Sequence, residues 1–433
     1  MRKQLIEKRL KEKLASKTTQ TVCLAMIVKN ESKIILRLLT SLLGKIDMIS
    51  IVDTGSSDNT KEIIEDFGKQ NKIPTAVHCE EFKNFCYNRT HSVKKAQETF
   101  PKATFILLSD ADFIWEGDFP NKNFLIEQGY SIEQYSQDYR YWNTRLLKAN
   151  IDWECKGVTH EFWRACKNQT KYQGTINMFA KITSLRINDQ EDGGCKLDKF
   201  ERDERLLKEA LANPKNEEKG ILIRYKFYLA QTLRTMGKYD ESNEWYLKRI
   251  EDKDYDEEVY FCYYKIGTNY EHMAWKHLDE IKEECKHKQD ENDDTETDYE
   301  SEEDVLEEHE KYNETAIKFF NLAKEYFKKA YHFRKTRAEA LYALTRLHRI
   351  ISEHSEAYRN ALIGKKIKYP SNDNLFIEAN CYDYLFDYEI SIVAPYIGKK
   401  EIGAKALGKL LARKHDLPSH ILKTCEHNAQ FYI

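Results

Sequence analysis

The chain has 433 residues, a mass of 51.3 kDa and a formal net charge of −3 at pH 7. Hydrophobic residues make up 41% of it and charged residues 33%, a composition that supports two or three folded domains and excludes a wholly disordered chain. It has no run of about eighteen uncharged apolar residues, and its start, MRKQLIEKRLKEKLASK, is too charged for a signal peptide, so we expect a cytoplasmic protein with no integral membrane segment.

The first half of the sequence alternates strand-like and helix-like segments. Short apolar runs typical of buried strands occur at 21–28 (TVCLAMIV), 48–55 (MISIVDTG) and 103–110 (ATFILLSD). Helical spacing follows at 32–44, and again at 56–68, where Ser57 or Asp58 is the expected cap and Gly68 the expected end. Strands that alternate with helices of about ten to fifteen residues predict an α/β fold with a mostly parallel sheet covered on both faces.

Acidic residues stand where these strands end. The run at 21–28 is followed by Glu31, the run at 48–55 contains Asp53 near its end, and the run at 103–110 ends at the D-x-D pattern of Asp110 and Asp112. Ligands of such sheets bind beyond the carboxyl ends of the strands. Two carboxylates at this place can hold Mg²⁺ or Mn²⁺ together with phosphate oxygens, whereas a polar exit from the strand is the simpler interpretation of D-x-D alone.

The segment IVDTGSSDNT, residues 51–60, follows a strand and opens a helix. Backbone N–H groups and the helix dipole at such a position can meet a nucleotide. Ser56, Ser57 and Thr60 are better explained as residues of an ordinary capped loop. Asp53 differs from them, because a carboxylate at the end of a strand can accept a hydrogen bond from a nucleobase.

From residue 199 onward the pattern is helical. Aromatic and small apolar residues recur at i, i+3, i+4 and i+7, and Gly237 separates two helical segments. The repeat length is near 34 where it is measurable, as in tetratricopeptide arrays, which predicts stacked helix pairs. We interpret the aromatic stripes as core, with contact to an acceptor molecule as the alternative.

One segment interrupts the helical pattern. Residues 290–310 contain thirteen Asp or Glu and no Lys or Arg, so the rest of the chain is net basic. The segment has few apolar side chains to bury, so we expect a disordered acidic insertion at 286–311. The alternative is an acidic segment that binds a partner. The basic remainder favours anionic ligands, although solubility alone also explains it.

Five motifs occur in order along the first half: AMIVKNES, IVDTGSSDNT, FKNFCYNRTHSVKKA, LLSDAD and KGVTHEFW. Together they resemble the GT-A glycosyltransferases of family 2, in particular the branch with a tetratricopeptide-like C-terminal region, which includes bacteriocin cysteine S-glycosyltransferases. The resemblance extends over about residues 21 to 415. It implies a Rossmann-like GT-A domain followed by an all-α tetratricopeptide-like repeat domain.

The resemblance also implies roles for individual residues. Glu31 and Asp53 correspond to residues near the ribose and base of the donor nucleotide. Asp110 and Asp112 correspond to the D-x-D residues that hold the metal and the diphosphate. Arg89 matches an arginine near the sugar-nucleotide donor. The N–H groups of its guanidinium suit hydrogen bonds to phosphate.

A further candidate lies in the segment 153–163, WECKGVTHEFW. The Trp and Phe side chains of this segment offer apolar walls for a sugar, and the matching position in the resembling family carries the same His-Glu pair. We therefore take Glu161 as the candidate general base. The alternative is that Glu161 only orders the loop through a backbone contact or Arg164. His160 has three candidate roles, as a metal ligand beside Asp112, as a diphosphate contact, or as the base itself.

The sequence therefore predicts a metal-dependent inverting glycosyltransferase, with Mn²⁺ or Mg²⁺ as cofactor. Its expected partners are a nucleoside-diphosphate sugar, which we take to be UDP-linked, and an acceptor that is a glycan, a protein or a peptide. No nucleic-acid partner is expected. The predicted domains are a basic extension at 1–20, a GT-A domain at 21–195 and the helical region at 196–433. The alternative is a noncatalytic helical-repeat scaffold built on a decayed transferase domain, which the intact acidic residues argue against.

Overall fold

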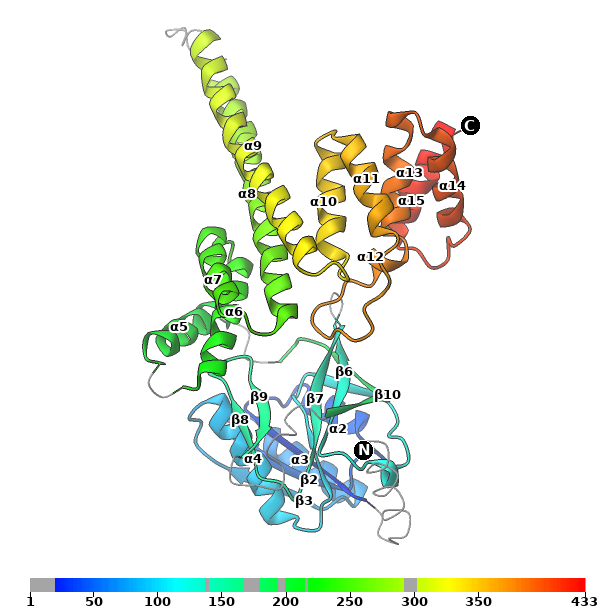
Figure 1. Cartoon of the computed structure of the whole chain (residues 1–433). Coiled ribbons are helices and arrows are strands. Elements are labelled where there is room, and N and C mark those ends of the chain that lie inside the picture. The colour runs from blue at the N-terminus through cyan, green and yellow to red at the C-terminus, as the bar shows by residue number, and fades with distance from the viewer. Residues whose placement is uncertain are drawn as a thin grey trace. The chain divides into compact units, whose positions relative to one another are not determined.

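A computed structural model describes residues 20–136, 140–166, 179–193, 199–214, 217–291 and 302–432, without the side chains of 281–291 and 302–313 (Figure 1). The chain divides into two units, residues 1–215 and 216–433. The predicted extension at 1–20 lies almost wholly outside the described residues. The predicted boundary at 195 precedes helix α5 (Lys199–Ala212), which is grouped with the first unit.

The N-terminal unit is built on an eight-stranded sheet whose order is β3-β2-β1-β4-β7-β6-β10-β5. The first four of these strands run parallel, β6 and β10 are also a parallel pair, and β7 and β5 run antiparallel to their neighbours. Strands β8 and β9 form a separate hairpin. The bounds are β1 Val22–Val28, β2 Met48–Asp53, β3 Thr75–Cys79, β4 Phe105–Leu108, β5 Phe113–Gly117, β6 Gly129–Tyr135, β7 Arg140–Lys148, β8 Trp153–Lys156, β9 Phe162–Ala165 and β10 Phe179–Asp189.

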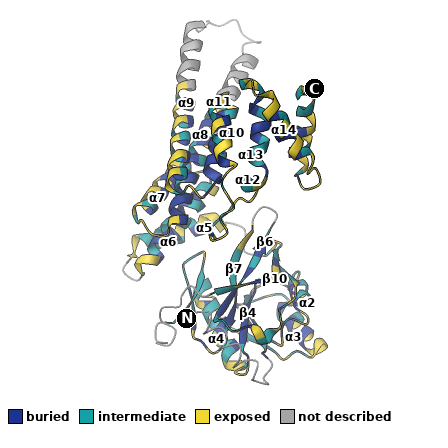
Figure 2. Cartoon of the chain, turned by 45° about the vertical axis from the view of Figure 1, so that its right-hand side comes forward, coloured by how far each residue is buried: buried dark blue, intermediate teal, exposed yellow. Residues whose placement is uncertain are grey.

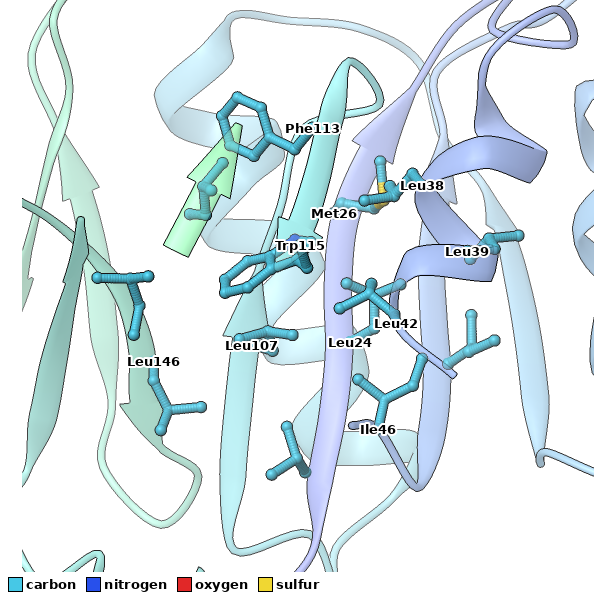
Figure 3. Close-up of a cluster of buried hydrophobic side chains, with 14 of the residues drawn as sticks. Leu24, Met26, Leu38, Leu39, Leu42, Ile46, Leu107, Phe113, Trp115 and Leu146 are labelled. Atoms are coloured by element: carbon cyan, nitrogen blue, oxygen red, sulfur yellow. The ribbon is translucent and has the colours of Figure 1, made fainter. Parts of the chain in front are cut away.

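Helices cover both faces of this sheet. Helices α2 (Ile35–Ser41) and α3 (Thr60–Asn71) share a core with Leu24 and Met26 of β1, whereas α4 (Phe85–Thr99) packs with Cys23 and Ala25 of the same strand. Figure 3 shows the first of these cores, where Leu38 of α2 and Leu42, the residue after that helix, lie beside β1. Successive side chains of a strand point to opposite faces, so a strand buried on both sides is an unbroken apolar run. A short helical turn, η1, spans Lys122–Phe124.

The second unit is all-helical within the residues described, and its helices are joined in successive pairs, α6 with α7, α8 with α9, α10 with α11 and α13 with α14. Figure 2 shows buried residues on the facing sides of these helices. Gly237 lies between α6 and α7, as predicted. The bounds are α6 Lys219–Thr235, α7 Tyr239–Glu251, α8 Asp256–Glu291, α9 Glu302–Phe333, α10 Glu339–Ile350, α11 His354–Gly364, α12 Asn380–Asp383, α13 Leu385–Val393, η3 Pro395–Ile397, α14 Lys400–Leu411, α15 Ser419–Ala429 and η4 Gln430–Tyr432.

This architecture confirms the predicted fold class, an α/β unit followed by an all-α unit. The structure differs from the prediction at the acidic insertion, because α8 continues to Glu291 and α9 begins at Glu302. Glu, Lys and Gln have high helix propensities, and each end of the insertion continues a helix that packs against the other. Residues 292–301 lie outside the described part of the chain. No helix within the described residues is both long and apolar enough to cross a membrane.

Helix α3, expected to end near Gly68, continues to Asn71, with Lys72 in the left-handed conformation as its C-cap. The glycine serves a different purpose, since a Cβ built on it would lie 2.1 Å from Thr75 Oγ1 and 2.7 Å from Thr75 Cβ. Gly68 therefore allows α3 to approach the start of β3 closely.

We predict that Gly68→Ala destabilises the N-terminal unit by about 1 to 3 kcal/mol, because overpacking against Thr75 outweighs the better helix propensity of alanine. Urea unfolding measures the change. Gly408→Ala is the matched control, because Gly408 also lies inside a helix but a Cβ there would meet nothing within 4 Å. The control should be neutral or slightly stabilising, and equal effects of the two substitutions would contradict the packing explanation.

Candidate functional site

The loops after β1 and β2 are joined by hydrogen bonds at the carboxyl ends of the two strands. The backbone N–H of Asn30 donates to Ser56 Oγ (2.9 Å), and the N–H of Glu31 donates to Thr60 Oγ1 (2.8 Å). Asp58 in turn accepts from the Thr60 hydroxyl and backbone N–H. The structure thus supports the interpretation of these Ser and Thr residues as parts of an ordered loop, and it holds the backbone of Glu31 beside the first residue of α3.

Asp53, the last residue of β2, is 5% exposed. Its Oδ1 accepts hydrogen bonds from the backbone N–H groups of Gly55 (2.8 Å) and Ser56 (2.7 Å). Its Oδ2 makes no hydrogen bond to any described residue. One oxygen therefore holds the turn while the other can accept from a ligand, which is compatible with the predicted contact to a nucleobase.

The centre of the candidate site is an ion triad formed by Arg89, Asp110 and Arg145. Arg89 Nη1 of α4 lies 2.8 Å from Asp110 Oδ1, and Arg145 Nη1 of β7 lies 3.1 Å from Asp110 Oδ2. Each carboxylate oxygen of Asp110 is thus matched by one guanidinium. The structure brings Arg89 and Asp110 together as predicted and adds an arginine that the sequence analysis missed.

Local interactions place both arginines. The side chain of Asn84 caps α4 by accepting from the N–H of Tyr87 (2.8 Å), and the buried Asn88 ties the preceding loop to the helix. On the other side, the Arg145 guanidinium lies 4.6 Å from the centre of the Phe113 ring and donates to Gln134 Oε1 (3.1 Å). The Arg145 side chain is only 9% exposed, so its position is set by packing as well as by charge.

The electrostatics of the triad follow from its burial. Burial alone would raise the pKa of the Asp110 carboxyl, but Arg89 and Arg145 together hold that pKa below its usual value. Burial likewise opposes the charge of Arg89, yet the nearby carboxylates of Asp110 and Glu161 raise its pKa. Asp110 is therefore ionised at neutral pH, and Glu161 is close enough to act on the same guanidinium.

Glu161 and His160 lie in the turn between β8 and β9. His160 has φ of +51° and is exposed, whereas Glu161 is partly buried. The turn is tied to α4, because Cys86 Sγ donates to the carbonyl of Gly157 (2.6 Å). The structure therefore brings Glu161 to the arginine at the centre of the site and leaves His160 at the surface.

The structural alternative for Glu161 involved a backbone contact or Arg164. Arg164 Nε instead donates to Glu154 Oε1 at 2.6 Å. Glu161 makes no hydrogen bond or ion pair with the residues that the structure describes. Its carboxylate is consequently available to a ligand.

The expected apolar walls need a correction. Trp153 is 2% exposed and belongs to the core behind the sheet, where its Nε1 donates to the carbonyl of Lys148 (2.9 Å). The reason is the alternation of β8, whose residues Trp153 and Cys155 point inward toward α4. Trp153 therefore cannot line a sugar cleft, whereas Phe162 and Trp163 are only partly buried.

Asp112 lies against a segment that follows β10, residues 190–193. The N–H of Gln190 donates to the Asp112 carbonyl (3.1 Å), and a Cβ built on Gly193 would lie 3.1 Å from Asp112 Oδ2. A bidentate ion pair holds this segment against α2. Arg37 Nη1 donates to Asp192 Oδ2 at 2.7 Å, and Arg37 Nη2 donates to Asp192 Oδ1 at 2.6 Å. A side chain at Gly193 would crowd the Asp112 carboxylate while this segment stays in place.

The predicted metal ligands were Asp110, Asp112 and His160. Within the described part of the chain, no three His, Cys, Asp or Glu side chains form a group that could hold a metal ion. Both oxygens of Asp110 are already matched by arginines, so of the two D-x-D carboxylates Asp112 is the better fit for a hard cation. The assignment of all three ligands stays a prediction.

Sequence reasoning missed Arg145, Gln134 and Arg37. Arg145 had one weak signal, since it directly precedes the apolar pair Leu146 and Leu147 in β7, and an arginine is rarely buried without a partner. Gln134 and Arg37 carry no signal of their own, because their roles depend on which segments the fold brings together.

We predict that Arg145→Met destabilises the protein by about 2 kcal/mol at pH 7, because Asp110 loses one of its two charge-assisted partners. Asp110 has a lower pKa in the folded protein than in the unfolded chain, where it is about 4. Its ion pairs therefore contribute fully to the free energy of unfolding above about pH 4, and this contribution is lost as the pH falls through the pKa of Asp110 in the folded protein.

Urea unfolding of wild type and variant across pH 2 to 7 checks this, and the difference should shrink below about pH 4. Arg186→Met is the matched control, because Arg186 is 52% exposed and lies 4.0 Å from Glu116. A difference that is independent of pH would mean that Arg145 acts through packing alone.

Comparison with known proteins identifies the first unit. Residues 23–187 match the model of the family described as glycosyl transferase family 2. A search of curated proteins finds no match to this chain. Solved structures with some similarity include TTC0263, a tetratricopeptide-repeat protein of Thermus thermophilus, with a TM-score of 0.30, 10% identity and coverage of 54% of this chain and 92% of that one.

They also include TarS of S. aureus, residues 1–349, with a TM-score of 0.27, 16% identity and coverage of 58% of this chain and 81% of that one. The same TarS fragment in complex with UDP matches with a TM-score of 0.27, 15% identity and coverage of 58% and 80%. TM-scores this low do not define a fold, and the assignment rests on the family match and on the sheet described above. The N-terminal unit of this chain therefore contains the region, residues 23–187, that matches glycosyl transferase family 2.

Proposed function

We propose that the protein transfers a sugar from a nucleoside-diphosphate donor, UDP-linked, to a glycan, protein or peptide acceptor, with inversion at the anomeric carbon and with Mn²⁺ or Mg²⁺ as cofactor. The observation that carries the proposal is the triad of Arg89, Asp110 and Arg145 in a family 2 domain, next to Asp112 at the carboxyl ends of the parallel strands. Ligands of such sheets bind at this edge.

In this proposal the nucleoside is held at the ends of β1 and β2. Asp53 Oδ2 accepts from the N–H of the base, and Glu31 contacts the ribose. The arginine nearer the surface, Arg89, is 24% exposed and suits a diphosphate oxygen, since a guanidinium can bridge a carboxylate and a phosphate. Asp110 then serves to orient Arg89 and Arg145 rather than to bind the donor alone.

Asp112 would hold the cation, together with diphosphate oxygens. A bound Mn²⁺ or Mg²⁺ supplies Lewis-acid stabilisation of the charge that develops on the leaving diphosphate. The segment 190–193 lies against Asp112 and limits the freedom of its carboxylate, and the ion pair of Arg37 with Asp192 keeps that segment in place. In this proposal the ends of β1 and β2 position the donor nucleotide, whereas the segment 190–193 positions the carboxylate of Asp112.

Glu161 would remove the proton from the acceptor. It lies near Arg89 and has no partner among the described residues, so the carboxylate can reach an acceptor hydroxyl or thiol without first breaking an ion pair. His160, exposed in the same turn, is the alternative base or a contact to the diphosphate. Donor hydrolysis with a panel of nucleotide sugars, with and without Mn²⁺, tests the function as a whole, and specific donor binding should raise the unfolding temperature.

We predict that Asp112→Asn abolishes metal-dependent donor hydrolysis while the unfolding temperature stays near that of wild type. The amide keeps the shape of the side chain and removes the charge that holds a cation. Asp118→Asn is the control, because the Asp118 side chain is 93% exposed and lies 3.8 Å from Lys45. Wild-type hydrolysis by Asp112→Asn at limiting Mn²⁺ would show that the metal assignment is wrong.

We predict that Glu161→Gln lowers the transfer rate by about 10² to 10⁴-fold with little change in donor affinity, because general-base catalysis contributes on that order. His160→Ala, measured in parallel, should weaken donor or metal binding if the histidine contacts the diphosphate. Transfer rates and donor affinities of both variants separate the roles. Near-normal transfer by Glu161→Gln would place the base elsewhere.

A further inference from the structure

The helical unit carries a group of basic side chains on α6, α8 and α10, far in sequence from the site described above. Arg234 lies near the end of α6, Lys265 and His272 lie two turns apart on one face of α8, and Arg346 lies on α10. Their charges act on one another, since Arg234, Arg346 and Lys265 all lower the pKa of His272 after the larger effect of burial. Three separate helices therefore bring positive charge to one place.

Arg234 has no counter-ion among the residues that the structure describes. Its Nη2 lies 3.4 Å from Nε2 of His272, and since an arginine can only donate, the histidine nitrogen must accept and the ring is neutral in this contact. The Nε of Arg234 is buried without a hydrogen-bond partner, and so is the Nε2 of Gln231, one turn earlier on α6. Within the described residues Arg234 forms no ion pair.

Lys265 is in a similar position. Its Nζ lies 4.4 Å from the ring centre of Tyr264 and 5.0 Å from that of Phe261, and no described carboxylate lies within ion-pair distance. Burial lowers the pKa of Lys265 to about 8, Glu378 opposes this and Arg234 lowers it further. Arg346 differs from both, because Glu271 neutralises it at 2.5 and 2.6 Å.

Buried N–H groups without partners and like charges in proximity both cost free energy, and an anion placed among them removes both costs. We propose that Arg234, Lys265 and His272 form a binding site for the carboxylates of an acidic polypeptide segment carried by the acceptor. This inference depends on the proposed transferase function in one respect, because it takes the acidic segment to be part of the acceptor.

A carboxylate on a side chain fits this site better than a phosphate. The ammonium of Lys265 lies over the rings of Tyr264 and Phe261, which are themselves buried in the core. A phosphate is also more strongly hydrated than a carboxylate. The several cations lie on different helices, so the ligand must also be longer than a single free ion.

The test is binding of a fluorescein-labelled peptide of ten glutamates to the full chain, followed by fluorescence anisotropy. A peptide of ten glutamines and inorganic phosphate as competitor serve as comparisons. The glutamate peptide should bind at least about tenfold more tightly than the glutamine peptide, and Arg234→Ala and Lys265→Gln should each weaken it about tenfold, the value of one charge-assisted contact. Lys265→Arg keeps the charge and should retain binding.

Lys329→Ala is the matched control. Lys329 also lies 4.4 Å from a tyrosine ring, that of Tyr326, but it is on α9 and pairs with Glu325 at 2.7 Å. This control should bind the glutamate peptide as wild type does. Equal binding of both peptides, equal effects of Lys329→Ala and Lys265→Gln, or binding of phosphate without binding of the glutamate peptide would overturn the proposal.

Donor hydrolysis by the same variants keeps the two proposals apart, because hydrolysis requires the N-terminal unit and no acceptor. It should be unchanged in Lys265→Gln and Arg234→Ala. A wild-type protein that hydrolyses no donor would contradict the proposed function, whereas the peptide-binding results alone decide the acidic-peptide site.

Discussion

The ion triad of Arg89, Asp110 and Arg145 is the interaction on which the candidate site depends. A carboxylate at the end of a buried strand is costly unless its charge is matched, and here each oxygen meets one guanidinium, from α4 on one side and β7 on the other. The triad also fixes two cations at the edge of the sheet. A single carboxylate thus gives a stable strand end and a cationic surface suited to an anionic ligand.

Around this triad the site is assembled from loops that have little freedom. Hydrogen bonds join the loops after β1 and β2, a thiol contact ties the Glu161 turn to α4, and the ion pair of Arg37 with Asp192 holds the segment beside Asp112. Each of these loops follows a strand or helix with a buried core. The precision of the site therefore comes from ordinary hydrophobic packing, to which short polar contacts add direction.

Much of this was predictable from the sequence, because strands buried on both faces are unbroken apolar runs and the residue after such a run lies at the edge of the sheet. Asp53 and Asp110 were located in this way, and the motif order predicted the family. Arg145 was not found, since its partner is reached only by pairing β7 with β4. Trp153 was misplaced because an aromatic residue in a short strand has no sequence signal for the face on which it lies. The roles of Asp112, His160 and Glu161 stay predictions.

The clasp between Arg37 and Asp192 has a consequence for where the first unit can be cut. The family match ends at residue 187, yet Gln190, Asp192 and Gly193 all contact the site or hold it in place. A fragment that stopped at 187 would keep every motif residue and lose the partner of Arg37 and the segment that covers Asp112. The end of the family match and the end of the folded unit are thus different residues. The end of the folded unit is set by the ion pair of Arg37 with Asp192, which are 155 positions apart in the chain.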